Sequence, residues 1–364
     1  MMSIYIHIPF CDKICSYCDF CKVLYNPSLV DKYLNNLEIE INKRYLEEEV
    51  DTVYIGGGTP SSLNIVQLER LFDIIKKIKR KKTCEFTIEA NFDSMSKEKL
   101  DLFKRYGVNR LSFGLETTNP SHLKFLNREF NSKQALDIIT YAKKIGLDNI
   151  NIDLIYALVN QSIADLKKDL DFIISLDIKH ISTYSLIIEN NTLLKVKNIK
   201  NIAEELDYKM YNFICKYLKD KDFIHYEISN FCKEGYESRH NLVYWYNLEY
   251  YGFGLGASSY IKNKRFTNTR SFNKYFSKEY ISVSEDITVH DKMEYEIILG
   301  FRLADGINKT NFYNKFGKKI DECYNYDRLI NNKFIIDDGN NIFIPEDKFY
   351  ISNEIIVQFI EGEK

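Results

Sequence analysis

The chain has 364 residues, too many for one ordinary small domain and too few for three. Its 50 basic and 52 acidic residues give a formal net charge of −2, so no global field favours nucleic acid or an anionic membrane surface. The first ten residues lack the regions of a secretory signal, and no segment has the roughly 20 apolar residues of a membrane span. We expect a cytoplasmic protein that does not bind nucleic acid.

Strand-like and helix-like segments alternate from the N-terminus. The expected strands are Ser3–Ile8, Thr52–Ile55, Phe86–Glu89, Arg110–Gly114, Ile150–Ile155 and His180–Leu186. The expected helices are Ser28–Leu46, Ile65–Lys79, Lys97–Tyr106, Lys133–Ile145 and Ile163–Ser175. This alternation predicts an α/β fold, a partial (β/α)6 TIM-like barrel with a parallel sheet inside a layer of helices. Functional side chains are then expected at the C-terminal ends of the strands.

The repeat ends near residue 200, and the chain becomes rich in Tyr, Asn and Gly between Tyr226 and Tyr260. A helix at Asp291–Leu303 and short strands beyond it indicate a small α+β domain. We therefore expect a barrel domain with a downstream extension at 1–285 and a C-terminal domain at 286–364. The basic run Lys76–Lys82 is interpreted as the solvated C-terminus of a helix.

Cysteines are concentrated directly after the first expected strand. Cys11, Cys15 and Cys18 have spacings that let one loop hold three corners of a [4Fe-4S] cluster through thiolates. The fourth iron would stay open to chelate S-adenosylmethionine (SAM) and pass an electron into its sulfonium, giving a 5′-deoxyadenosyl radical. Structural zinc is the alternative, and Cys21 could complete a four-cysteine site. Zinc sites usually pair two separated cysteine pairs, and no second pair follows, so the pattern favours the cluster.

Further motifs follow the cysteines in a fixed order. They are Tyr5–Cys11, Tyr17–Phe20, Gly56–Ser61, Thr87–Asn91, Gly107–Gly114, Asn151–Tyr156, Tyr226–Phe231, Ser238–Asn241, Tyr244–Trp245 and Gly252–Tyr260. With these motifs the chain resembles the radical SAM family of oxygen-independent coproporphyrinogen III oxidases and their heme-chaperone relatives of the HemW type. The resemblance runs through most of the chain. It implies a radical SAM barrel followed by the C-terminal domain of that family.

The resemblance also implies which residues bind SAM. They are Tyr5, Tyr17, Gly57, Gly58, Thr59, Glu89, Glu116, Arg128 and Asp153. The glycines let backbone N–H groups approach the methionine end closely, and a carboxylate at Glu89 accepts from its ammonium. Arg128 offers a planar fork for a carboxylate, and Asp153 can take ribose hydroxyls. Glu116 stands where the family usually has Gln, and still accepts hydroxyl groups.

Two functions of different class remain open, a heme-delivery protein and an enzyme that decarboxylates coproporphyrinogen III. Oxidases of the family have a fourth cysteine where this chain has Phe20, and an N-terminal extension before the first strand, which begins here at Ser3. The Cys18–Phe20 and Tyr226–Phe231 elements resemble the chaperone branch. We therefore expect a heme chaperone without oxidase activity. The oxidase is the alternative, and another radical SAM reaction is a third reading.

Heme or a porphyrin is then the expected cargo. His240, beside Tyr244 and Trp245, is the first candidate for an iron ligand, and a histidine held within a loop is the plainer interpretation. The family has a histidine where this chain has Ser258. A heme-acceptor protein and an electron donor are implied without being identified, and any peripheral membrane contact is expected only through the acceptors.

Overall fold

The computed structural model describes residues 1–363, which divide into two compact units. The first unit contains residues 1–213 and 249–285, and the second contains 214–248 and 286–364. The expected boundary at 285 therefore coincides with one of the boundaries of the structure. Residues 214–248, which were expected in the barrel domain, group with the C-terminal part of the chain. No helix of the described residues is long and apolar enough to cross a membrane.

The first unit is built on a sheet whose central strands are parallel. The strands are β1 (Ser3–Ile8), β4 (Val50–Gly57), β5 (Arg80–Asn91), β6 (Arg110–Glu116), β7 (Ile150–Tyr156), β8 (His180–Ser185), β11 (Tyr250–Phe253), β12 (Ser258–Ile261), β13 (Lys264–Asn268) and β14 (Ile281–Asp286). Their order is β14-β13-β12-β11-β1-β4-β5-β6-β7-β8. All pairs from β11 to β8 are parallel, which confirms the expected partial barrel.

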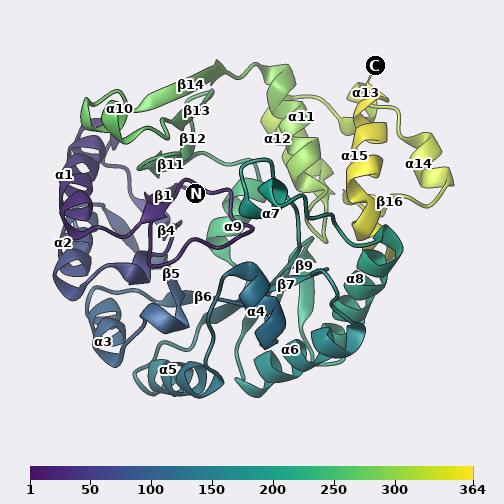
Figure 1. Ribbon diagram of the computed structural model, residues 1–364. Coiled ribbons are helices and arrows are strands. Elements are labelled where there is room, and N and C mark those ends of the chain that lie inside the picture. Colours follow the sequence, from purple (N-terminus) through teal and green to yellow (C-terminus); the bar gives the residue numbers. More distant parts are fainter. Residues whose placement is uncertain (364) are drawn as a thin grey trace. The chain divides into compact units, whose positions relative to one another are not determined.

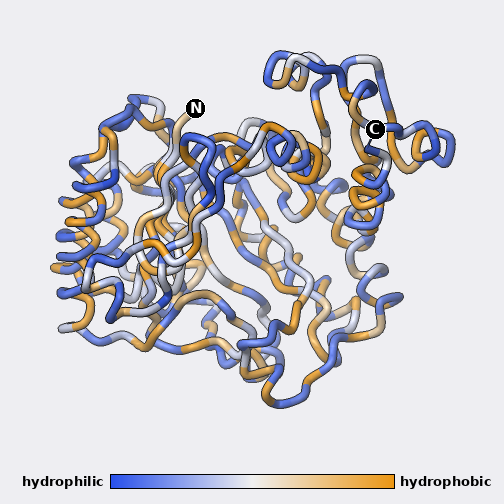
Figure 2. Tube along the Cα trace, turned by 90° about the horizontal axis from the view of Figure 1, so that it is seen from above, coloured by the Kyte–Doolittle hydropathy of each residue, from blue (hydrophilic) through white to orange (hydrophobic). Residues whose placement is uncertain are grey.

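Helices surround the outside of these strands, as Figure 1 shows. They are α1 (Pro27–Arg44), α2 (Ile65–Ile75), α3 (Lys97–Arg105), α4 (Pro120–Leu126), α5 (Ser132–Lys144) and α6 (Ile163–Ser175). Hydrophobic residues recur on successive turns of the flanking helices (Figure 2), as amphipathic helices on a sheet require. The helix expected to continue to Lys79 ends at Ile75 with Lys76 as its C-cap, and Arg80–Lys82 belongs to β5, so only the first part of the basic run lies at a helix C-terminus.

Alternation along the strands separates an apolar outer face from a polar inner face. Ile4, Ile6 and Ile8 on β1 are fully buried, as expected beneath helices. The intervening positions carry polar groups that bond across strands, for example Thr52 Oγ1 to Ser3 Oγ at 2.8 Å. The inward-facing positions of the other strands and of the rest of β1 are also polar. They carry Tyr5 and His7 on β1, Thr87, Glu89 and Asn91 on β5, and Asn151 and Asp153 on β7. The inner face of the barrel strands is therefore polar toward their C-terminal ends.

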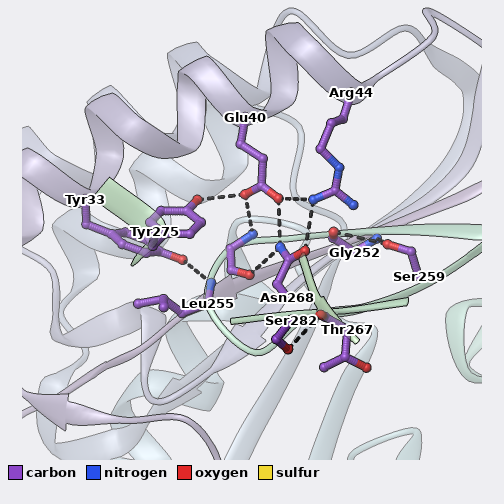
Figure 3. Close-up of polar contacts among 11 residues, drawn as sticks. Tyr33, Glu40, Arg44, Gly252, Leu255, Ser259, Thr267, Asn268, Tyr275 and Ser282 are labelled. Carbon is purple, nitrogen blue, oxygen red and sulfur yellow. Dashed lines mark hydrogen bonds and ion pairs between the residues drawn. The ribbon is translucent and has the colours of Figure 1, made fainter. Parts of the chain in front are cut away.

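A buried carboxylate joins α1 to the strands added after residue 248 (Figure 3). Glu40 is fully buried, and its Oε2 accepts from the Gly254 N–H at 2.9 Å and from the Tyr275 hydroxyl at 2.7 Å. Its Oε1 accepts from Asn268 Nδ2 at 2.7 Å and pairs with Arg44. Each buried oxygen of Glu40 therefore has donors, and these bonds hold the segments after residue 248 against α1.

The second unit contains one antiparallel pair of strands, a three-stranded sheet and short helices. Its strands are β9 (Ile224–Glu227) and β10 (Asn230–Cys232), which are antiparallel, and β15 (Ile307–Asn308), β16 (Ile336–Asp337) and β17 (Asn341–Phe343). Its helical segments are the end of α8 (Glu204–Lys219), α9 (Arg239–Trp245), α11 (Val289–Gly300), α12 (Lys309–Phe316), α13 (Ile320–Cys323), α14 (Asp327–Asn331), η3 (Glu346–Ile351) and α15 (Ser352–Ile360). Buried Phe301 and Phe359 pack edge to face at its centre. This α+β content agrees with the expected C-terminal domain.

Candidate functional site

The cysteine loop is anchored at both ends by a small parallel pair of strands. β2 (Phe10–Cys11) pairs with β3 (Val23–Leu24), so Cys11 lies opposite Leu24. The Tyr25 N–H donates to the Cys11 carbonyl at 2.8 Å and closes the loop. Because β2 follows β1 after a single residue, the loop stands at the C-terminal end of the barrel strands, where the sequence predicted it.

Cys11, Cys15 and Cys18 influence one another's ionisation, whereas the Cys21 thiol is affected by other residues. Burial raises the pKa of Cys11 to about 12, and the Cys18 and Cys15 thiols also contribute to this rise. Burial raises the pKa of Cys15 as well, with a further contribution from Cys18. The Cys21 side chain instead approaches Gly256, and burial raises its pKa against the opposing effect of Arg270. Three grouped soft donors suit an iron–sulfur cluster with three protein ligands, and bound iron would keep them deprotonated.

The end of β4 passes very close to the cysteine loop. A Cβ on Gly58 would lie 2.9 Å from Cys11 Sγ, and Gly57 has a φ of +119°, so only glycine fits here. The N–H of Gly58 donates to the Ile8 carbonyl and that of Thr59 to the Phe10 carbonyl, at 2.9 and 2.8 Å. These N–H groups are therefore already paired. These two N–H groups are therefore not the donors that glycine turns often supply to a ligand. Carbonyl oxygens of the turn could instead accept from a cationic group.

Glu89 lies inside the barrel at the end of β5. Its Oε2 accepts from the Gly57 N–H at 2.9 Å, and its Oε1 accepts from the Tyr54 hydroxyl at 2.8 Å. Burial raises the pKa of Glu89, although both hydrogen bonds favour its charged form. The carboxylate is thus held by two donors in a fixed direction next to the β4 turn.

Glu116 and Arg128 form a buried ion pair beside the cysteine loop. Glu116 Oε2 lies 2.8 Å from Arg128 Nη2, and Glu116 Oε1 accepts from the Tyr17 hydroxyl at 2.9 Å. Glu116 has a φ of +60° where the register of β6 against β7 shifts, so a strained bulge turns this carboxylate inward. Arg128 Nη1 is 3.9 Å from Cys15 Sγ. This pair therefore connects the barrel wall to the thiols.

Asp153 adds a third carboxylate on β7. Its Oδ1 accepts from Asn151 Nδ2 at 2.8 Å. Burial, and then the negative charge of Glu89, raise the pKa of Asp153 to about 7. Of the three carboxylates, Glu116 pairs with Arg128, whose Nε is buried without a hydrogen-bond partner among the described residues. Arg110 on β6 is a second buried guanidinium of the barrel. A ligand with cationic groups and a carboxylate fits the carboxylates of Glu89 and Asp153 and the unpaired donor of Arg128.

Tyr5 is connected to the cysteine loop through His7. The Tyr5 hydroxyl lies 2.9 Å from His7 Nδ1, and His7 Nε2 lies 2.7 Å from the Cys21 carbonyl. Since a carbonyl only accepts, Nε2 carries the proton and Nδ1 accepts from Tyr5. Burial lowers the pKa of His7 to about 4, so the ring is neutral at physiological pH. His7 is therefore a positioning residue for the end of the loop.

His240 lies in the second unit, within the first turn of α9. Its side chain is buried, and its Nε2 lies 2.8 Å from the Tyr244 hydroxyl. The two rings meet edge to face with centroids 5.2 Å apart. Ser258, where the family has a histidine, is exposed on β12 with its hydroxyl 3.0 Å from that of Thr267.

The sequence did not identify two residues that organise the site. Tyr54 holds Glu89, and Asn91 links Thr59 Oγ1 at 3.2 Å to Arg128 Nη2 at 3.1 Å. Both lie in the polar phase of their strands, two residues before Gly56 and two after Glu89. That alternation is the signal that could have found them.

Comparison with known proteins gives two family matches. Residues 5–173 match the Radical SAM superfamily, and residues 287–346 match the HemN C-terminal domain. The chain is 36% identical to the heme chaperone HemW of Lactococcus lactis, over 98% of this chain and 97% of that one. It is 37% identical to HemW of Bacillus subtilis over 89% of both chains, and 30% identical to HemW of Escherichia coli over 85% of both.

A solved structure supports the fold. Coproporphyrinogen III oxidase (HemN) from Escherichia coli superimposes with a TM-score of 0.86 and 20% identity, over 98% of this chain and 89% of that one. At this identity the likeness establishes the architecture alone. The identity to the HemW proteins over nearly the whole length goes further, and the chain belongs to the HemW family of radical SAM proteins.

Proposed function

We propose that this protein binds heme and delivers it to acceptor proteins, on a radical SAM scaffold that holds a [4Fe-4S] cluster and SAM. The observation that carries the proposal is its 36% identity to a heme chaperone over 98% of this chain and 97% of that one. Coproporphyrinogen III oxidase activity is the alternative that this resemblance does not favour.

Cys11, Cys15 and Cys18 would hold the cluster, and Cys21 would not. The mutual electrostatic influence of the first three thiols supports this assignment, as does the turn of Cys21 toward Gly256. When bound, such a cluster supplies an electron to the sulfonium of SAM. Arg128, 3.9 Å from Cys15 Sγ, would place a positive charge beside the ligand thiolates.

The polar wall of the barrel would bind SAM. Glu89 and the carbonyls of Gly57 and Gly58 would accept from the ammonium with Thr59 beside them, and the unpaired Nε of Arg128 would meet the carboxylate. Asp153 and Glu116 would accept from the ribose hydroxyls, and Tyr5 and Tyr17 would line the ligand. The carboxylates of Glu89, Glu116 and Asp153 on neighbouring strands support a cationic ligand at this place.

His240 would ligate the heme iron. Its Nε2 faces the Tyr244 hydroxyl, so ligation through this atom exchanges one hydrogen bond for an iron bond. Tyr244 and Trp245 on the same helix would offer apolar ring surface to a flat porphyrin. The heme acceptor and the electron donor would be proteins of the same compartment. We place this work in the cytoplasm, where cysteines stay reduced.

The test is an anaerobic comparison of heme binding with oxidase turnover. Cluster-loaded protein receives heme in an absorption titration, and in parallel receives coproporphyrinogen III, SAM and a reductant, with products separated by chromatography. We expect heme uptake and no protoporphyrinogen. Turnover without heme uptake would overturn the proposal in favour of the oxidase.

A pair of variants tests the ligand separately. His240→Ala should shift the absorption spectrum of bound heme and weaken its binding. His290→Ala is the control, because His290 is an exposed histidine of the same unit. Identical heme spectra for His240→Ala and the unmodified protein would exclude His240 as the ligand.

A further inference from the structure

The second unit contains a thiol, an imidazole and a carboxylate that converge on one point. Cys215 comes from the end of α8, His225 from β9, and Glu346 from the start of η3. Cys215 Sγ lies 4.0 Å from His225 Nδ1, which lies 3.3 Å from Glu346 Oε1. All three donor atoms lie within 4.8 Å of one another. Residues separated by more than a hundred positions are thus brought to one place with metal-ligating atoms facing inward.

The histidine of this cluster is oriented from behind. His225 Nε2 lies 3.4 Å from the Ile228 carbonyl and Nδ1 lies 3.3 Å from the Glu346 carboxylate, and both of these oxygens can only accept. A metal bound at Nδ1 would leave the proton on Nε2, directed at the Ile228 carbonyl, and the lone pair of Nδ1 would then point to an ion held with Cys215 and Glu346. The ring stacks on Phe231 with centroids 4.1 Å apart and meets Phe349 edge to face at 5.2 Å. A backbone carbonyl behind a histidine is the usual outer partner of a metal ligand.

The cluster is accessible and has a suitable charge. Together with Asp222 and Glu234 it lines a cavity of about 490 Å³, which gives an ion a path from solvent. Among the described residues that line this cavity, Lys219 is the one cationic side chain, and its Nζ lies 3.6 Å from Glu346 Oε2. Because Lys219 takes Oε2, the other oxygen stays directed at His225.

We propose that Cys215, His225 and Glu346 form a binding site for a divalent transition-metal ion of the zinc class, with one coordination position open to the cavity. A thiolate, an imidazole and a carboxylate together suit zinc, whereas calcium and magnesium require oxygen ligands. Tetrahedral zinc bonds of about 2.0–2.3 Å place ligand atoms about 3.3–3.6 Å apart. The present 3.3 and 4.0 Å separations reach that geometry with a small rotamer shift.

Binding would release the thiol proton of Cys215 to solvent as the Zn–S bond forms. It would also tie α8, β9 and η3 of the second unit together. The site is separate from the cysteine loop and does not depend on the heme proposal, since its test uses neither heme nor SAM.

The experiment is a zinc titration of the full chain with its cluster reconstituted under anaerobic conditions. A chromophoric chelator competes for the metal, and cobalt replaces zinc in a parallel sample to report thiolate ligation by its charge-transfer absorption. We expect one more tightly bound equivalent in the unmodified protein than in Cys215→Ser, His225→Gln or Glu346→Gln. Each variant should lose at least about tenfold in affinity, and zinc should raise the thermal midpoint of the unmodified protein alone.

Cys323→Ser is the matched control, because Cys323 is a buried cysteine of the same unit and is not one of the three proposed zinc ligands. It should retain the extra equivalent, and iron content should be equal in all samples so that loss of the iron–sulfur cluster is not mistaken for loss of zinc. Glu346→Gln changes an exposed side chain and keeps the test valid if the buried substitutions unfold the unit. Equal zinc binding by the unmodified protein and the three variants, or cobalt binding without a thiolate band, would overturn the proposal.

Discussion

Asp153 should make SAM binding dependent on pH near neutrality. Burial and the charge of Glu89 raise the pKa of Asp153 from its ordinary 3.8 to about 7, so the unliganded site holds a proton that a typical aspartate has lost. The ionised carboxylate accepts from ribose hydroxyls and attracts the sulfonium more strongly than the protonated form. SAM affinity carried by Asp153 should therefore rise as the pH rises through about 7, and fall as the pH drops below it.

The size of this effect follows from the ionised fraction. With a pKa of about 7, Asp153 is about 9% ionised at a pH of about 6 and about 91% ionised at about 8. If SAM binds only the ionised form, its apparent affinity changes by up to about tenfold between these two conditions. The amino group of SAM also titrates, with a pKa of about 7.7–8.0. Its contribution cancels when unmodified protein and the Asp153→Asn variant are compared at each pH.

Isothermal titration calorimetry of the cluster-loaded proteins measures this directly. The ratio of SAM affinities, unmodified protein over Asp153→Asn, should increase by up to about tenfold from the lower to the higher pH. Iron content measured at both pH values serves as the control for cluster integrity. A ratio that stays constant with pH would refute the reasoning, because Asp153 would then either not titrate in this range or not contact the ligand.

Three tests, two of them with a matched control substitution, address the remaining assignments. Cys11→Ala should abolish binding of about four irons per chain, whereas Cys21→Ala should retain it, as iron analysis and the visible spectrum will measure; equal loss in both would contradict the open iron. Glu89→Gln should weaken SAM binding roughly 10- to 100-fold in calorimetry, because a charged hydrogen bond contributes about 1.5–3 kcal/mol, and unchanged affinity would remove Glu89 from the site. Glu40→Ala should lower the free energy of unfolding in urea by about 3–5 kcal/mol, since it leaves Arg44 without its buried partner. Glu38→Ala on the same helix should cost about 1 kcal/mol or less, and equal small losses would show that the network of Glu40 does not stabilise the unit.

The barrel was readable from the sequence because each repeat carries its own local signal. The apolar alternation of Ser3–Ile8 predicts a strand without knowledge of its partners, and the structure has the same strand. The helix Pro120–Leu126 was missed because seven residues give too little periodicity. The grouping of residues 214–248 with the C-terminal segment was also missed, because it depends on packing between segments far apart in the chain.

The sequence indicated the residue types of the candidate site but not the contacts between them. The spacing of the cysteines is a local property, and it places them on one loop after the first strand. The hold of Tyr54 on Glu89 depends on the register of β4 against β5, and the inward turn of Glu116 depends on a bulge between β6 and β7. The sequence of a single strand does not predict its register against the neighbouring strand. The paired N–H groups of Gly58 and Thr59 likewise reversed the expected use of the glycine turn.

The electrostatics of the barrel wall connect ligand binding to stability. A carboxyl whose folded pKa lies above its unfolded value destabilises the fold when it ionises, so Asp153 reduces stability progressively as the pH rises from about 4 to about 7. Burial raises the pKa of Glu89 in the same direction. A cationic ligand would lower both pKa values and reverse this cost, because it brings positive charge close to both carboxylates. The same residues that weaken the unliganded unit are therefore the ones that would make binding of SAM favourable.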